Sequence, residues 1–143
     1  MKRGVDYIGV AVGAMILNDK GEVLLCKRSK HAYNEKGCWE VPGGAVEFGE
    51  KLEDAIRREI REELGVEIEL IEQFPAADHI IPSDKQHWVP TTYLARLKPG
   101  NIPKIMEPLK CDALDWFPLE HLPSPLSLIT QYDVSYYKNR KRI

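Results

Sequence analysis

Three acidic residues stand close together near the middle of the chain: Glu59, Glu62 and Glu63. In a helix, positions i, i+3 and i+4 project from neighbouring points of one surface. Three carboxylates held that close repel one another unless a positive charge lies among them. Carboxylate oxygens without nearby cysteine or histidine favour a hard cation over zinc, so the spacing predicts a site for Mg²⁺ or Mn²⁺. The alternative is a solvated helix face on which Arg58 pairs with Glu62.

The apolar spacing around these acids predicts the helix that carries them. Apolar residues recur at three- and four-residue intervals over residues 52–64, and Gly65 follows where glycine commonly ends a helix. On a helical wheel, Glu59 and Glu63 fall within the apolar arc, whereas Glu62 falls at its edge. A charged carboxylate turned toward the core carries a large desolvation cost unless it is compensated. The wheel therefore favours the metal site over the solvated face.

The sequence around this helix resembles the Nudix box. Gly44, five residues, Glu50, seven residues and then the run 58–66 (REIREELGV) fill every specified position of that motif. The segment 39–44 (WEVPGG) is similar to the family's usual lead-in, and residues 107–123 resemble its usual closing strand and turn. Because the motif is long and its gaps are fixed, chance agreement is far rarer than for a short glycine motif. The chain is similar to Nudix hydrolases over most of its length.

Strands that alternate irregularly with two helices predict an α+β fold, and the resemblance implies the Nudix α/β/α sandwich with a mixed β-sheet between helices. The length of 143 residues predicts a single domain over residues 1–143. We expect strands over 7–17, 23–26, 66–74, 87–97 and 113–117, a helix over 52–64, and a second helix over 124–137.

Several local details accompany these elements. Residues 18–21 (NDKG) predict a hairpin turn between the first two strands, and residues 80–85 are expected to form a turn. Pro90 predicts an edge or a bulge in its strand because proline cannot donate to the ladder. Ser124 is the predicted N-cap of the last helix, followed by proline at its first position. Four apolar or aromatic residues are predicted to lie near one face of this helix: Leu126, Ile129, Tyr132 and Tyr136.

The resemblance also assigns roles within the box. It implies that Glu59, Glu62 and Glu63 bind the metal together with the carbonyl of Gly43, and that Glu59 acts as ligand or as base. Arg58 orients the glutamates through bidentate hydrogen bonds. Glu50 either supports these ligands or completes the metal set.

Further candidates lie outside the box. Nudix enzymes commonly take one more carboxylate from a loop in the region of residues 102–110, and Glu107 is the first candidate, with Asp112 second. Arg28 stands where the family often places a basic residue on the substrate's phosphates; the alternative is a surface arginine at a strand end. Glu40, in the lead-in, is a second candidate for substrate contact.

Stacking on a nucleobase is one role for His87, Trp88 or Tyr93, although ordinary sheet packing is favoured. The activity implied by the resemblance is metal-assisted hydrolysis of a nucleoside diphosphate linked to another moiety. The chain looks closest to nucleoside-triphosphate pyrophosphatases of the MutT type, which release a nucleoside monophosphate and pyrophosphate. One alternative is an ADP-ribose or ADP-sugar pyrophosphatase, suggested by Pro82. Another is a non-catalytic Nudix-fold nucleotide sensor, against which the intact set of acids argues.

Composition restricts the partners. A net charge of −2 and a pI near 6.1 give no nucleic-acid signature, and no apolar run is long enough to span a bilayer. The basic tail, residues 138–142, is expected to be a solvated terminus. The three cysteines, Cys26, Cys38 and Cys111, are odd in number and lack the spacing of a metal site. They indicate unpaired residues of a reducing compartment, and hence a cytoplasmic protein. We expect a small nucleotide as partner, and a homodimer is compatible with the family, many of whose members dimerise.

Overall fold

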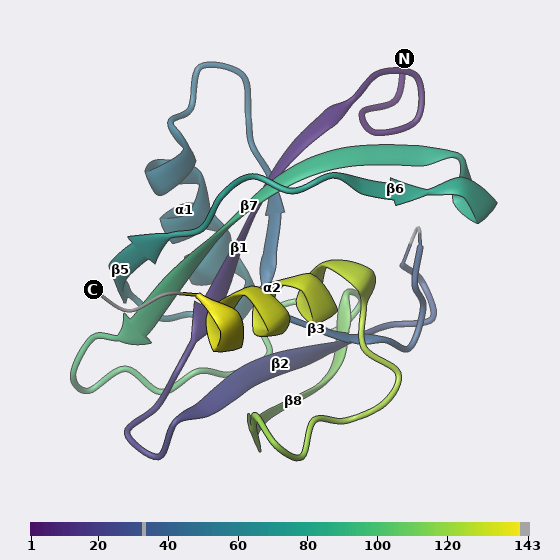
Figure 1. Cartoon of the computed structure of the whole chain (residues 1–143). Coiled ribbons are helices and arrows are strands. Elements are labelled where there is room, and N and C mark those ends of the chain that lie inside the picture. Colours follow the sequence, from purple (N-terminus) through teal and green to yellow (C-terminus); the bar gives the residue numbers. More distant parts are fainter. Residues whose placement is uncertain (33, 141–143) are drawn as a thin grey trace.

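Two sheets and two helices form the part of the chain that the computed structural model describes, residues 1–32 and 34–140 (Figure 1). The elements in chain order are β1 (Gly9–Ile16), β2 (Glu22–Arg28), β3 (Trp39–Glu40), β4 (Gly43–Ala45), α1 (Leu52–Leu64), β5 (Ile68–Gln73), β6 (His79–Ile81), the 3₁₀ turn η1 (Pro82–Asp84), β7 (Gln86–Leu97), β8 (Cys111–Pro118) and α2 (Leu128–Asn139).

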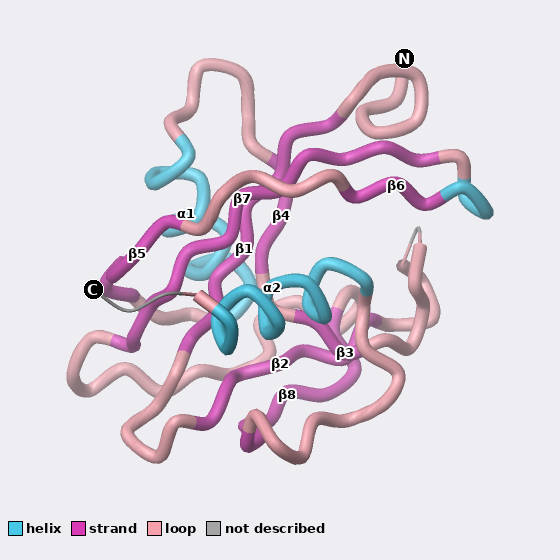
Figure 2. The backbone as a smooth tube through the Cα atoms, viewed as in Figure 1, coloured by secondary structure: helices cyan, strands magenta, loops and turns pink. Residues whose placement is uncertain are grey.

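The larger sheet is mixed. Its order is β4-β1-β7-β5, and β6 also pairs with β7. Strands β1 and β7 run parallel, whereas the other pairs in this sheet are antiparallel. The smaller sheet is antiparallel, with the order β3-β2-β8 (Figure 2). This architecture confirms the predicted α+β class.

The helices cover opposite faces of the larger sheet. Alternate residues of β1 separate into two buried clusters, with Val12, Ala14 and Ile16 toward α1 and Met15 toward α2. Helix α1 has the predicted bounds, and Gly65 ends it in the left-handed conformation at φ 68°. Most of its apolar face is buried, with Leu52 partly so, and full burial of an isoleucine or leucine side chain contributes about 1.5–3 kcal/mol. The buried residues of the helix are Ala55, Ile56, Glu59, Ile60 and Leu64.

The turn at residues 18–21 forms, but it does not produce the predicted hairpin. The Asn18 side chain accepts hydrogen bonds from the backbone N–H groups of Lys20 and Glu22. Only one antiparallel bridge, between Leu17 and Val23, joins the two strands before they separate into different sheets. The reason is that both edges of β1 are already occupied, by β4 and by β7.

The turn expected over residues 80–85 is partly a strand. Residues 79–81 form β6 against β7, and a 3₁₀ turn follows. Because β7 pairs on both sides, Pro90 does not mark an edge strand. Its carbonyl accepts the N–H of Ala77, within the stretch where β5 has ended and β6 has not begun. The missing proline N–H therefore faces a break in the pairing.

Helix α2 begins later than predicted. Its N-cap is Ser127, whose side chain accepts a hydrogen bond from the N–H of Thr130, so the predicted cap at Ser124 is wrong. The preceding residues are instead held beside β3 through backbone hydrogen bonds to Trp39. Leu126 and Tyr136 of the predicted face pack against the core, whereas Tyr132 is exposed. The buried residues of the helix are Thr130, Asp133 and Val134.

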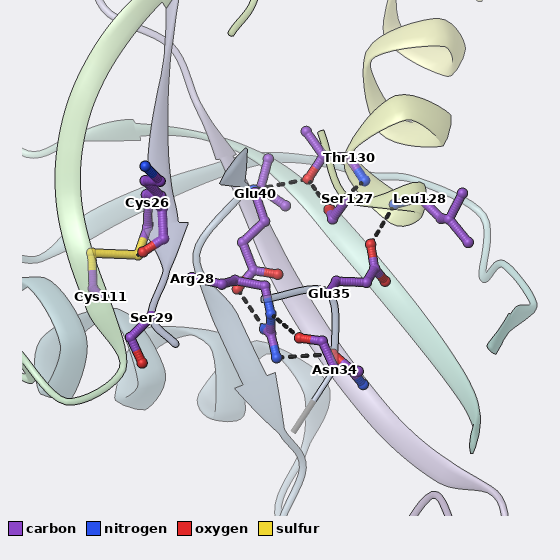
Figure 3. Close-up of polar contacts among 12 residues, drawn as sticks. Cys26, Arg28, Ser29, Asn34, Glu35, Glu40, Cys111, Ser127, Leu128 and Thr130 are labelled. Atoms are coloured by element: carbon purple, nitrogen blue, oxygen red, sulfur yellow. Dashed lines mark hydrogen bonds and ion pairs between the residues drawn. A yellow bond between two sulfur atoms is a disulfide. The ribbon is translucent and has the colours of Figure 1, made fainter. Parts of the chain in front are cut away.

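Cys26 and Cys111 form a disulfide between β2 and β8, with their Cα atoms 6.0 Å apart (Figure 3). The expectation of three unpaired cysteines is therefore wrong, and Cys38 is the free one among the described cysteines. A separation of 85 residues hides this pair in the sequence. No helix in the described ranges is long and apolar enough to cross a membrane. Residues 141 and 142 of the predicted basic tail lie outside the described residues.

Candidate active site

Two glycines bring the backbone of β4 against β1 and against helix α1. A Cβ atom added at Gly43 would overlap the carbonyl oxygen of Val12 in the adjacent strand β1. A Cβ atom added at Gly44 would overlap the carboxylate of Glu59. The obstacle at Gly43 is main chain, whereas at Gly44 it is the end of the Glu59 side chain, so Gly44 places main chain directly beside the buried acid of the helix.

Arg58 ties the loop after β4 to the helix. Its Nε and Nη2 donate to the two carboxylate oxygens of Glu50, at 2.7 and 2.9 Å, and Nη2 also donates to the Ala45 carbonyl at 3.1 Å. Its Nη1 donates to Glu59 at 3.0 Å and to Glu62 at 3.3 Å. The paired hydrogen bonds from Arg58 lower the pKa of Glu50 to about 2. The acids of the loop and of the helix therefore share the guanidinium group of Arg58.

The acids on α1 differ in burial as the wheel predicts. Glu59 is only 8% exposed, whereas the Glu62 side chain is 51% exposed. Burial raises the pKa of Glu59, although the hydrogen bond from Arg58 opposes that rise. The pKa of Glu63 is raised well above its ordinary value, first by burial and then by the negative charges of Glu59, Glu40 and Glu107. These carboxylates lie within electrostatic range of one another, and the positive charge of Lys110 offsets the rise in the Glu63 pKa only in part.

The loop over residues 102–110 places Glu107 at this group of acids. The N–H of Met106 donates to the Glu63 carbonyl at 2.9 Å, so the loop lies against the C-terminal end of α1. One carboxylate oxygen of Glu107 is buried without a hydrogen-bond partner, and the other lies 3.5 Å from Nζ of Lys110. Asp112, the other candidate, is exposed on β8. Of the two, Glu107 is the one that the structure brings to the acids.

Arg28 has three acceptors within the protein (Figure 3). Its Nη1 donates to Glu40 at 2.8 Å, and its Nε and Nη2 donate to the carbonyl and side-chain oxygens of Asn34, each at 2.9 Å. Both charged side chains of the Arg28–Glu40 pair are 22% exposed. Burial raises the pKa of Glu40, and Arg28 opposes that rise. Arg28 therefore holds β3 and the loop before it together rather than standing free at the surface.

Replacing Arg28 tests this assignment through stability. We expect Arg28→Ala to lower the free energy of unfolding by about 2–4 kcal/mol, because it leaves the buried carboxylate of Glu40 unpaired. The matched control is Arg57→Ala, which removes an exposed pair with Glu53 at 3.8 Å and is expected to change stability by less than about 0.5 kcal/mol. Urea denaturation measures both. Adding Glu40→Gln to Arg28→Ala should recover part of the lost stability. Equal stability of Arg28→Ala and Arg57→Ala would contradict the assignment.

A second group of polar side chains adjoins the Arg28 pair. Glu35 accepts the N–H of Leu128 at 2.8 Å, and its other oxygen lies 2.7 Å from Nε2 of His79. Asn34 donates to Gln86 at 2.7 Å. These contacts join the loop before β3 to β6, β7 and the start of α2. No local motif predicts them, because each partner comes from a different region of the sequence.

Two of the three residues considered for base stacking, Trp88 and Tyr93, pack within the protein. The Trp88 ring lies where a Cβ atom at Gly4 or Gly9 would be, and its Nε1 donates to Gln86 at 2.9 Å. Tyr93 is 2% exposed and belongs to the core cluster beneath α1. Sheet packing, the favoured interpretation, describes both residues.

The acidic side chains of this group offer only oxygen donors. Over residues 1–32 and 34–140, no three acidic, histidine or cysteine side chains converge as the ligands of one ion. The chemistry of the group nevertheless favours a cation, because the negative charges of three other carboxylates raise the pKa of Glu63 and Glu107 has an unpaired buried oxygen. Oxygen donors alone suit Mg²⁺ or Mn²⁺.

Fold and site together define a class: an α+β protein that gathers buried carboxylates beside a glycine-rich strand-to-helix connection. Comparison with known proteins identifies that class. The family model described as the NUDIX domain matches residues 8–138, and the chain belongs to this family. The acids, Arg58 and the two glycines all lie within the matched residues.

Individual relatives agree with the family assignment. The crystal structure of a MutT NUDIX hydrolase from Burkholderia pseudomallei superposes with a TM-score of 0.83 at 40% identity, covering 91% of this chain and 98% of that one. The 8-oxo-dGDP phosphatase NUDT18 of Homo sapiens is 33% identical over 128 residues, which are 88% of this chain and 36% of that protein. Nucleoside triphosphatase NudI of Escherichia coli is 49% identical over 61 residues, 43% of each chain. These matches span less than half of either curated relative.

Proposed function

We propose that this chain hydrolyses nucleotides in a Mg²⁺-dependent reaction, cleaving a nucleoside triphosphate or a modified nucleotide to the monophosphate and pyrophosphate. The observation that carries the proposal is the group of poorly compensated carboxylates formed by α1 and Glu107. The relatives named above act, by their names, on 8-oxo-dGDP and on nucleoside triphosphates. A diphosphate or triphosphate chain is the type of ligand that carboxylate-bound Mg²⁺ recruits.

The residues that would hold Mg²⁺ are Glu59, Glu62 and Glu63, with the Gly43 carbonyl and Glu107 as further donors. When bound, Mg²⁺ neutralises phosphate charge and lowers the pKa of a bound water. Arg58 supports the arrangement from outside, because it binds Glu50 through two oxygens and reaches Glu59 and Glu62 with its remaining nitrogen. In this proposal Glu50 acts through Arg58.

A proton acceptor is also required, because the attacking water must lose a proton during hydrolysis. Glu59 suits this role as well as metal binding, since its raised pKa brings it closer to neutral pH than an ordinary glutamate. The Glu59 carboxylate lies against the main chain at Gly44 and accepts a hydrogen bond from Arg58 at 3.0 Å. We infer that Glu59 and Glu63 are the acids on which turnover depends most strongly.

A substrate panel tests the proposal. The protein is incubated with Mg²⁺ and, separately, with dNTPs, oxidised dGTP and dGDP, ADP-ribose and dinucleoside polyphosphates, and the phosphate products are resolved by chromatography. We expect monophosphate and pyrophosphate from a triphosphate, and loss of turnover when EDTA removes the metal. Tight binding of one nucleotide without hydrolysis of any would contradict the proposal and favour the sensor. Preferred cleavage of ADP-ribose would show that the substrate class is ADP-sugars rather than nucleoside triphosphates.

Location in the cytoplasm stays a prediction of the sequence. The Cys26–Cys111 disulfide counts against it, because such bonds are rare in reducing compartments.

A further inference from the structure

Lys110 is the last residue of the loop that carries Glu107. Its backbone is held on both sides: its N–H donates to the Glu107 carbonyl at 2.9 Å, and its carbonyl accepts the N–H of Ser29 at 3.0 Å. Ser29 is fully buried and also donates through its hydroxyl to the Leu109 carbonyl, at 2.5 Å. The Cα atom of Lys110 is therefore fixed beside the acids, whereas its side chain is 68% exposed.

The ammonium group of Lys110 is weakly engaged. It lies 3.5 Å from Oε2 of Glu107, at the long limit of a hydrogen bond, and the pair is exposed enough to contribute little to stability. Its charge also lowers the pKa values of Glu59 and Glu63, so it lies within electrostatic range of both. A flexible stem and three donors let such a group change partners at small cost.

The other positively charged side chains at this site already make hydrogen bonds within the protein. The lysine and arginine charges that act most strongly on Glu40, Glu59 and Glu63 come from Arg28, Arg58 and Lys110. Arg28 donates to Glu40 and Asn34, and Arg58 donates to three glutamates and to a main-chain carbonyl. Of these three side chains, Lys110 is the one that can turn toward an incoming anion without breaking a buried contact.

We propose that Lys110 is a substrate-binding residue that contacts the phosphate chain of the nucleotide. The inference rests on the proposed hydrolysis and extends it to a residue outside the Nudix box. A phosphate oxygen offers the ammonium group a charge-assisted hydrogen bond, which is stronger than the long ion pair with Glu107. Leaving Glu107 also frees that carboxylate for the metal. Lys110 thereby links arrival of the substrate to release of a ligand.

The test compares Lys110→Met, which keeps most of the stem and removes the charge, with Lys104→Met in the same loop. At saturating Mg²⁺, we expect Lys110→Met to raise KM for the nucleotide about tenfold, the equivalent of one charged hydrogen bond. The kcat should stay within about twofold, and Lys110→Arg should return KM to within about threefold of wild type. Lys104→Met should match wild type, because the Lys104 side chain is exposed and the residue is held through its backbone N–H, which donates to the Leu64 carbonyl.

Two further measurements separate substrate contact from mere support of Glu107. Rising ionic strength should lower kcat/KM of the wild type more steeply than that of Lys110→Met. Calorimetric titration with inorganic pyrophosphate should give weaker binding to Lys110→Met than to wild type. The proposal is overturned if Lys110→Met alters only the Mg²⁺ concentration needed for half-maximal rate, or if Lys104→Met raises KM equally. If the wild type hydrolyses no nucleotide, the proposed function fails, and the pyrophosphate titration alone then decides whether Lys110 binds phosphate.

Discussion

Glu63→Gln is expected to lower kcat by at least about a hundredfold while the protein remains folded. Loss of a residue that only supports a metal ligand commonly costs 10–100-fold, so loss of a ligand itself should cost about that much or more. The amide keeps the shape of the side chain but removes the charge that a divalent cation requires. Steady-state rates at several Mg²⁺ concentrations measure the effect.

The same substitution should leave stability unchanged or increase it. The folded-state pKa of Glu63 is raised well above the ordinary value of 4.5, because of burial and three neighbouring acids. For an acid with a raised folded-state pKa, the destabilising contribution appears as pH rises through the ordinary pKa and is complete above the folded-state pKa. Without metal at neutral pH, a neutral amide removes this contribution.

Glu53→Gln provides the matched control. Glu53 lies in the first turn of the same helix, with a side chain that is 62% exposed. We expect wild-type rates from this variant, because its carboxylate is remote from the acids that raise the pKa of Glu63. Full activity in Glu63→Gln, or an equal loss in Glu53→Gln, would rule out the assignment of Glu63 as a ligand.

The helix and its buried acids were predictable because they depend on local spacing. Apolar periodicity and Gly65 give the bounds of α1, and the same wheel separates the buried Glu59 from the exposed Glu62. The box similarly identifies Arg58 and Glu50, whose contacts cross only eight residues of sequence. Local patterns record such short-range geometry.

Contacts between segments far apart in the sequence could not be predicted from local patterns. The Cys26–Cys111 disulfide depends on β8 pairing with β2, and the place of β2 depends on β1 already having two neighbours. The start of α2 shifts because the segment before it forms backbone hydrogen bonds with Trp39 rather than helical ones. Lys110 gains its significance from Glu107 and Ser29, the second of which lies in another part of the chain. These features depend on which strands and segments pair with one another, and that pairing cannot be read from local patterns in a single sequence.

The two glycines of β4 should respond differently to alanine, and the difference follows from what each Cβ atom meets. At Gly44 the obstacle is the far end of the Glu59 side chain, which can move. We expect Gly44→Ala to fold, with a loss of about 1–3 kcal/mol, and to lower kcat about a hundredfold or more because Glu59 is displaced.

At Gly43 the obstacle is the main chain of β1, namely the Val12 carbonyl and the Cα atom of Gly13, which cannot move without disturbing the sheet. Gly43→Ala should therefore cost about 3 kcal/mol or more in the free energy of unfolding. Thermal unfolding and kcat, measured together on both variants, separate a displaced acid from a damaged sheet. Because Glu59 is the residue that Gly44→Ala displaces, adding Glu59→Gln to Gly44→Ala should lower kcat little beyond Glu59→Gln alone. If the losses in kcat from the two substitutions multiply in the double variant, Gly44→Ala does not act through Glu59. Near-wild-type kcat in Gly44→Ala would show that turnover tolerates movement of Glu59.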